Sequence, residues 1–173
     1  MLSRKPKKPL SNDEALARCA ELCNRSEQCT PDLHSKMHRW GLSFEDTMKI
    51  VEQLEELGYV DDRRFVRAYA HDKVCFSGWG RYKIERALRA KFIDRDIVDL
   101  AMEGVEDEEY LAAACKATAA KLRQFRPEYP EYEKHMKVLA HVMQRGFEMP
   151  VAKKALREVL AQLEEDDLGG DYV

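Results

Sequence analysis

The chain has 173 residues, and its 29 Lys and Arg against 32 Asp and Glu give a formal net charge of −3. Gly and Pro are few, with 8 and 6 residues, while Ala, Leu, Glu, Lys and Arg fill long stretches. This composition favours an all-α protein. The longest apolar run, residues 111–115, is far shorter than the roughly 20 residues that cross a bilayer, so a membrane-spanning helix is excluded.

The first ten residues carry several cations but neither an apolar stretch nor a small-residue cleavage site. We therefore expect a disordered basic tail over 1–10 and not a secretory signal. Five cysteines, an odd number without a secretion signal, suit a reducing compartment better than a disulfide framework, and we expect a cytoplasmic protein. The cysteines are Cys19, Cys23, Cys29, Cys75 and Cys115.

Residues that satisfy free backbone groups mark the ends of the expected helices. Ser11 and Glu14 form a capping box, and Thr30 and Ser43 are expected to cap the next two helices. No segment has the length and alternation of an ordinary strand. The signals predict helices over residues 12–24, 30–40, 43–57, 62–73, 81–90, 94–103, 107–125, 131–146 and 150–163.

A pattern of apolar residues recurs three times along the sequence. The segment that starts at Leu33 matches one at Ile84, 51 residues further on, and a third at Val138 after another 54 residues. The matched columns are apolar and have the spacing of two amphipathic helices joined by a tight turn, in which Gly41 and Gly146 share a column. The apolar columns are Leu33/Ile84/Val138, Met37/Leu88/Val142, Leu42/Ile93/Phe147, Ile50/Ala101/Ala155, Val51/Met102/Leu156 and Leu54/Val105/Val159.

A further helix precedes each matched pair, which predicts three tandem three-helix units over 11–60, 61–105 and 106–163, followed by an acidic tail over 164–173. Such units resemble helix-turn-helix modules, which often dock on nucleic acid. Tandem units usually form an elongated, curved body. That shape favours a long partner over a small ligand.

The stretch from residue 54 to 102 carries a specific resemblance. Its parts are Leu57-Gly-Tyr-Val-Asp-Asp-Arg-Arg-Phe65, the loop Gly78-Trp79-Gly80, and Arg81-x-x-Ile84-x-x-x-Leu88-x-x-Lys91. In this order they resemble the RecX recombination regulators, and the likeness extends over nearly the whole chain. Phe92 stands where that family commonly has glycine, and Trp79 lies inside the glycine loop.

The resemblance implies a cytoplasmic protein without enzymatic activity that binds the RecA recombinase. It further implies that the protein lodges along the helical groove of the RecA filament on single- or double-stranded DNA. There it would modulate RecA, generally by inhibiting ATP hydrolysis and strand exchange, and so act in homologous recombination, DNA repair and the SOS response.

The middle of the chain is basic although the whole is nearly balanced. Between residues 63 and 96 there are ten Lys and Arg but four Asp and Glu, a local charge of +6. Arg86 and Arg89 are three residues apart and can share a solvent face, which would suit a groove lined by phosphates or carboxylates. An ordinary solvated helix face is the alternative. The candidate partner-binding and DNA-binding residues are Arg63, Arg64, Arg67, Arg81, Lys83, Arg86, Arg89 and Lys91.

Two features near this segment have competing interpretations. Trp79 can insert into a partner or stack on a base, but packing against the core is the favoured interpretation because tryptophans are usually highly buried. Asp61 and Asp62 are interpreted as a helix cap and a first-turn acid, not as ligands or catalysts.

One constellation comes near a zinc site: Cys19 and Cys23 are followed by His34 and His38 at almost the spacing of a Cys₂His₂ finger. A finger presents its cysteines from a hairpin, which is not predicted here, although two packed helices can also hold a metal. The favoured interpretation is buried cysteines at a helix seam beside exposed histidines, with no metal.

Motifs of catalysis do not occur in the sequence: there is no P-loop, no Gly-x-Gly-x-x-Gly after a strand and no Gly-x-Ser-x-Gly. We therefore expect no enzyme activity, no cofactor and no small-molecule substrate. The alternative to a RecA regulator is a helix-turn-helix DNA-binding regulator that acts without a recombinase.

Overall fold

The structure is a computed structural model that describes residues 10–169, with side chains up to residue 166; most of the expected N-terminal tail and the last four residues lie outside this range. Within it every regular element is helical, and no helix is long and apolar enough to cross a membrane. The elements are α1 (Asn12–Arg25), α2 (Thr30–Arg39), α3 (Phe44–Glu56), α4 (Asp62–Cys75), α5 (Arg81–Arg89), α6 (Arg95–Val98), the 3₁₀ helix η1 (Ala101–Gly104), α7 (Asp107–Leu122), α8 (Glu131–Gln144) and α9 (Met149–Gly169).

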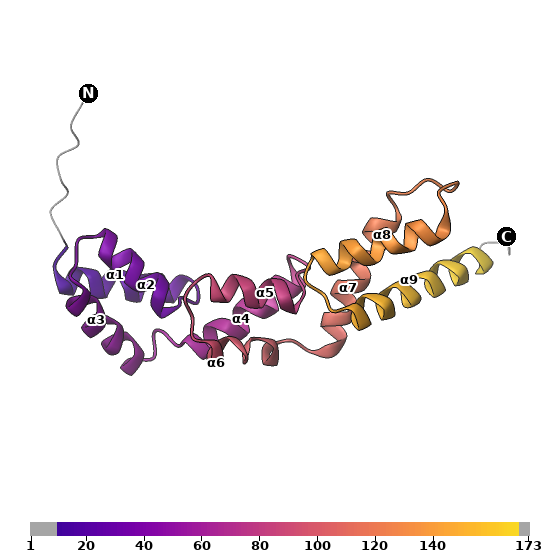
Figure 1. Cartoon of the computed structure of the whole chain (residues 1–173). Coiled ribbons are helices and arrows are strands. Elements are labelled where there is room, and N and C mark those ends of the chain that lie inside the picture. Colours follow the sequence, from indigo (N-terminus) through magenta and orange to yellow (C-terminus); the bar gives the residue numbers. More distant parts are fainter. Residues whose placement is uncertain (1–9, 170–173) are drawn as a thin grey trace, which may run out of the picture.

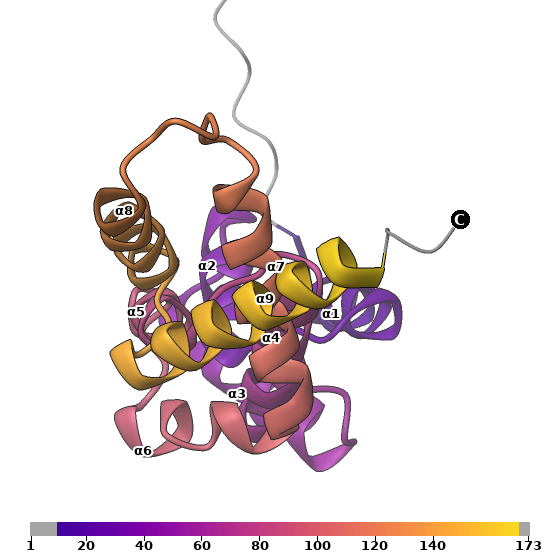
Figure 2. The same cartoon turned by 90° about the vertical axis from the view of Figure 1, so that its right-hand side faces the viewer.

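Three helical units follow one another along a long, shallowly curved axis (Figure 1). The first unit contains α1 to α3, the second α4 to η1, and the third α7 to α9. Seen from the C-terminal end, the third unit lies in front of the other two (Figure 2). The second helices of the units, α2, α5 and α8, succeed one another along one edge of the body (Figure 1). The predicted all-α array of three-helix repeats is thereby confirmed.

Burial follows the predicted repeat. Of its eighteen apolar positions all are buried except Met102 and Val105, which are half-buried. The shared turn between the second and third helices is also repeated, because Gly41 (φ 94°), Phe92 (φ 63°) and Gly146 (φ 99°) all have left-handed backbone conformation. The second unit therefore makes with phenylalanine a turn that the other two make with glycine.

The buried side chains form two cores. One belongs to the first unit and is built around Leu33, Met37 and Leu54. The other is shared by the second and third units, and Cys29, at the start of α2, is buried in it as well. The second and third units are thus fused more closely to each other than to the first, as expected for repeats that bury their apolar faces against neighbours.

The expected cap of α2 is wrong by one residue. Cys29 occupies the N-cap position and makes no side-chain capping bond. The Asp62 carboxylate takes its place: it accepts hydrogen bonds from the Thr30 backbone N–H (2.8 Å) and from the Thr30 hydroxyl (2.6 Å). Asp61 caps α4 as expected, whereas Asp62 also fastens the second unit to the first.

Other helix ends differ from the prediction. The helix expected over 94–103 is instead two short elements, α6 and η1, and both pack against α4; a Cβ atom on Gly104, at the end of η1, would come within 2.8 Å of the Arg67 carbonyl oxygen. Helix α4 ends two residues later than expected and α7 three residues earlier. Helix α9 extends six residues past its predicted end, so the acidic residues 164–167 belong to it.

Candidate interaction surface

Helix α5 separates an apolar face from a basic one. Ile84 and Leu88 are fully buried and anchor the helix, while Arg86 and Arg89 project from the opposite face into solvent. Among the described residues Arg86 has no ion-pair partner, and Arg89 lies 3.4 Å from Glu85 on its own helix. Tyr82, one turn before Arg86, is 60% exposed, so an aromatic ring joins the two guanidinium groups on this face.

Four of the eight candidate cations instead form ion pairs with acids outside their own helix. Three of these pairs join units: Arg64 and Lys91 contact acids of the first unit, and Arg81 contacts an acid of the third. The fourth, Arg67, is paired within the second unit. The N···O distances are 2.6 Å for Arg64–Glu27, 2.6 Å for Lys91–Asp32, 2.8 Å for Arg81–Glu148 and 2.6 Å for Arg67–Glu103.

The pair Lys91–Asp32 is the more enclosed of the two contacts with the first unit. Burial alone would raise the pKa of Asp32, but the hydrogen bond and charge of Lys91 outweigh it and the pKa is lowered. The same pairing outweighs the burial of Lys91, whose pKa is raised. Both partners therefore remain charged near neutral pH, and the pair holds the start of α2 against the end of α5.

At the other end of α5 a tyrosine connects the second unit to the third. The Tyr110 hydroxyl accepts a hydrogen bond from the Arg81 backbone N–H (2.8 Å) and donates one to Glu148 Oε2 (2.6 Å). Burial and the Glu148 carboxylate raise the pKa of Tyr110, which keeps the hydroxyl protonated as the donor. Because Glu148 also binds the Arg81 guanidinium, Arg81 has a structural contact on both its backbone and its side chain.

The glycine loop lies at this same junction. A Cβ atom on Gly80 would come within 2.2 Å of the Gly146 carbonyl carbon, so only glycine fits there. The Gly80 N–H donates to the Arg145 carbonyl (2.8 Å), and the Tyr82 N–H donates to the Gly146 carbonyl (3.0 Å). We call Gly80 and Gly146 together the glycine junction; it joins the start of α5 to the end of α8.

Trp79 is half-buried against the shared core, in agreement with the favoured sequence interpretation. The ammonium groups of Lys83 and Lys73 lie 4.4 Å and 5.0 Å from the centroid of its ring. Lys83 therefore has an aromatic partner and no ion pair among the described residues. Of the eight candidates, Arg63, Lys83, Arg86 and Arg89 make no salt bridge to another helix within the part of the chain that the structure describes.

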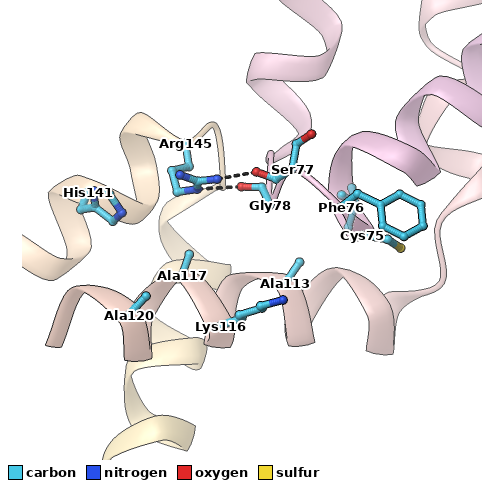
Figure 3. Close-up of a pocket in the computed structure, with 11 residues that line it drawn as sticks. Cys75, Phe76, Ser77, Gly78, Ala113, Lys116, Ala117, Ala120, His141 and Arg145 are labelled. Atoms are coloured by element: carbon cyan, nitrogen blue, oxygen red, sulfur yellow. Dashed lines mark hydrogen bonds between the residues drawn. The ribbon is translucent and has the colours of Figure 1, made fainter. Parts of the chain in front are cut away.

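A pocket of about 230 Å³ lies beside the glycine junction, between the end of α4, α7 and α8 (Figure 3). Its basic side chains are Lys116, His141 and Arg145. The Arg145 guanidinium donates hydrogen bonds to the Ser77 and Gly78 carbonyl oxygens, as the dashed lines in Figure 3 show, and so fixes the loop. The pocket is smaller than typical ligand sites, and its arginine already has partners.

The structure does not bring together the four residues of the near-zinc constellation. Cys19 is buried, and burial followed by the proximity of Cys23 raises the pKa of its thiol to about 11. His34 Nδ1 lies 3.0 Å from the Thr47 hydroxyl. Over the described residues the one group of three metal-ligand atoms that lie close together contains none of the four; it consists of His71, Cys75 and Glu109.

The sequence did not predict the exposure of two aromatic residues: Tyr82 on α5, and Phe92 just after it, which is identified from the sequence only as a residue at a family glycine position and is 87% exposed. The spacing of Tyr82 four residues before Arg86 predicts that the two share a face. The signal for Phe92 is the repeat itself, which aligns this residue with Gly41 and Gly146 at a turn and not with a core column.

Three repeated three-helix units in a linear array, with a basic face on the second helix of the middle unit, define a helical-repeat protein of the helix-turn-helix type. Comparison with known proteins makes this more specific: residues 61–102 match the second three-helix domain of RecX, and residues 107–156 match the third. The chain belongs to the RecX family.

Its relatives are regulatory proteins. The chain is 30% identical over 139 residues to the regulatory protein RecX of Legionella pneumophila (strain Corby), covering 80% of this chain and 89% of that protein. It is 28% identical over 147 residues to the regulatory protein RecX of Prosthecochloris aestuarii, covering 85% and 94%. The crystal structure of RecX from Lactobacillus salivarius has the same fold, with a TM-score of 0.76 at 14% identity over 86% of this chain and 96% of that one.

Proposed function

We propose that this chain binds the RecA filament on DNA and lowers its rates of ATP hydrolysis and strand exchange. Membership of a family of regulatory proteins supports a regulatory role. In this proposal the exposed face of α5, with Arg86, Arg89 and Tyr82, makes the central contact with phosphates of the DNA or carboxylates of the recombinase.

The observation that carries this proposal is the division of the candidate cations into two groups. Arg64, Arg81 and Lys91 are paired with acids of neighbouring units, so they fix the shape of the array. Arg86 has no such partner in residues 10–166, whose side chains are described, and Arg89 has a loose contact within its own helix. A helix that keeps two cations and an aromatic ring in solvent, while its neighbours are neutralised, is suited to a negatively charged partner.

The shape of the array supports a long partner with a regular repeat. Since α2, α5 and α8 lie along one edge, equivalent turns recur along the body (Figure 1). Lys36 and Arg39 add cations to the last turn of α2. The net charge of −3 argues against tight binding to bare duplex DNA, which favours a composite surface of DNA and protein.

The test is the ATPase rate of the cognate RecA on single-stranded DNA, titrated with the full chain at two salt concentrations. The proposal predicts that the rate falls at amounts substoichiometric to RecA and that more protein is needed at the higher salt concentration. An unchanged rate would contradict it. If the protein then showed saturable, sequence-selective binding to bare duplex, the helix-turn-helix regulator without a recombinase would replace it.

A further inference from the structure

A group of three potential metal ligands lies between the second and third units, apart from the basic face of α5. His71 and Cys75 are four residues apart on α4, so they share one face of that helix. Glu109 reaches them from the first turn of α7. One ligand atom from each residue lies within 4.8 Å of the other two.

From this geometry we infer that His71, Cys75 and Glu109 form a site for a divalent transition metal such as Zn²⁺. The inference does not depend on the proposed regulation of RecA. Bonds of about 2.0–2.3 Å to N, O and S in a tetrahedral site separate neighbouring ligand atoms by roughly 3.3–3.8 Å. His71 Nε2 is 3.9 Å from Glu109 Oε2, so small side-chain rotations bring the ligands to bonding distance.

The kinds of ligand atom favour Zn²⁺ over Mg²⁺ or Ca²⁺. A thiolate and an imidazole are ligands of Zn²⁺, Co²⁺ and related ions, whereas Mg²⁺ and Ca²⁺ prefer oxygen alone. Three protein ligands leave a fourth position for water or for a group from a partner. All three side chains are at least partly exposed, so an ion can reach them from solvent.

A neighbouring carboxylate is placed to orient the histidine. Asp72 Oδ1 lies 3.6 Å from His71 Nδ1, on the other side of the ring from Glu109. This distance is just beyond that of a hydrogen bond, and a small rotation of either side chain closes it; a carboxylate bonded to Nδ1 favours the tautomer that presents Nε2 to a metal and strengthens the ligand. Asp72 is therefore a positioning residue for the site.

Binding would fasten the second unit to the third. Helix α4 is the first helix of the second unit and α7 the first of the third, and the two helices are in contact. Figure 3 shows Cys75 near α7, on the side of the pocket away from His141. A metal held by both helices adds a link to the junction, and its binding energy then adds to the stability of the folded chain.

The test titrates the reduced, tag-free full chain with Co²⁺ and follows the absorption band of a cobalt–thiolate bond. We expect the band to saturate at one equivalent of Co²⁺, to disappear in Cys75→Ser and to require about 10-fold to 100-fold more Co²⁺ in Asp72→Asn. Zn²⁺ should remove the band by displacement and raise the melting temperature of the wild-type chain but not of Cys75→Ser.

Two matched variants control for other ligands. Cys115→Ser removes another half-buried helical cysteine, and His38→Asn removes an exposed histidine; neither belongs to the group, and both should keep the band. Absence of the band in the wild-type chain, its persistence in Cys75→Ser, or its loss in Cys115→Ser would each overturn the inference. Circular dichroism confirms that every variant compared is folded.

Discussion

Phe92 shows how one residue departs from the repeat that surrounds it. It lies in the left-handed turn where the first and third units have glycine, and its ring is 87% exposed. A side chain in this conformation costs about 1–2 kcal/mol, and little burial is gained in return. The turn forms all the same because the buried residues on either side of it, Leu88 and Ile93, fix its path.

We expect Phe92→Gly to raise the free energy of unfolding by about 0.5–1 kcal/mol. The substitution removes the strain of a Cβ atom at positive φ, but glycine also makes the unfolded chain more flexible, and this offsets part of the gain. Urea unfolding measures the change. Phe92→Ala is the matched control, because it removes the ring and keeps the Cβ atom. If the two variants were equally stable, the strain assigned to this turn would be absent.

Two histidines make stability depend on pH near neutrality. Burial lowers the pKa of His34 below 6.5, and burial with the charges of Lys121 and Arg145 lowers the pKa of His141. A histidine whose pKa is lowered in the folded state takes up a proton more readily in the unfolded state, so protonation favours unfolding. Its contribution to the free energy of unfolding is therefore fully present above about pH 6.5 and is lost as the pH falls through the lower, folded-state pKa.

The free energy of unfolding should therefore decrease between pH 7.5 and pH 5, and His34→Gln with His141→Gln should make this dependence shallower. Urea unfolding at several pH values measures it. The exposed His38, changed to Gln, serves as the control with the wild-type slope. An unchanged slope in the double variant would show that other groups cause the dependence.

At the scale of elements, the sequence predicts the features that depend on neighbouring residues, namely helix caps and buried helix faces. The caps Ser11, Ser43 and Asp61 and the apolar columns recur in the structure because each acts within one helix or one turn. The contacts between units could not be predicted in this way. Lys91 and Asp32 are 59 residues apart and Arg81 and Glu148 are 67 apart, so only the packing of the units reveals these pairs.

The residues of the candidate site were likewise predicted only in part. Helical spacing predicts that Arg86 and Arg89 share a solvent-exposed face, and in the structure both side chains are exposed on α5. The same spacing could not distinguish them from Arg64 or Lys91, because the distinction depends on acids of another unit. Their role in binding a partner remains a prediction.

The glycine junction provides a test of how the second and third units meet. We expect Gly80→Ala to lower the free energy of unfolding by about 3 kcal/mol, because its Cβ atom would overlap the backbone at Gly146. Gly58→Ala is the matched control: its φ of 73° gives strain of about 1 kcal/mol, but its Cβ atom would contact nothing within 4 Å. Urea unfolding compares the two, and equal losses would contradict the tight junction.

At the scale of the whole molecule, the units form a body whose shape is fixed from within. Ion pairs and the Asp62–Thr30 contact join the first unit to the second, while a common core and the glycine junction join the second to the third. Cations used in these contacts hold the array together. Those left on α5 face solvent, and the proposed function depends on them.

The measurement that tests this most directly compares inhibition of the cognate RecA ATPase by two double variants of equal charge change. Arg86→Glu with Arg89→Glu reverses the two exposed arginines of α5; Lys153→Glu with Arg157→Glu reverses two exposed cations on α9. We predict that the α5 variant needs at least about 10-fold more protein for half-inhibition, a loss of about 1.4 kcal/mol, while the α9 variant behaves like the wild type. Equal inhibition by both variants, each with wild-type helicity, would contradict the assigned surface.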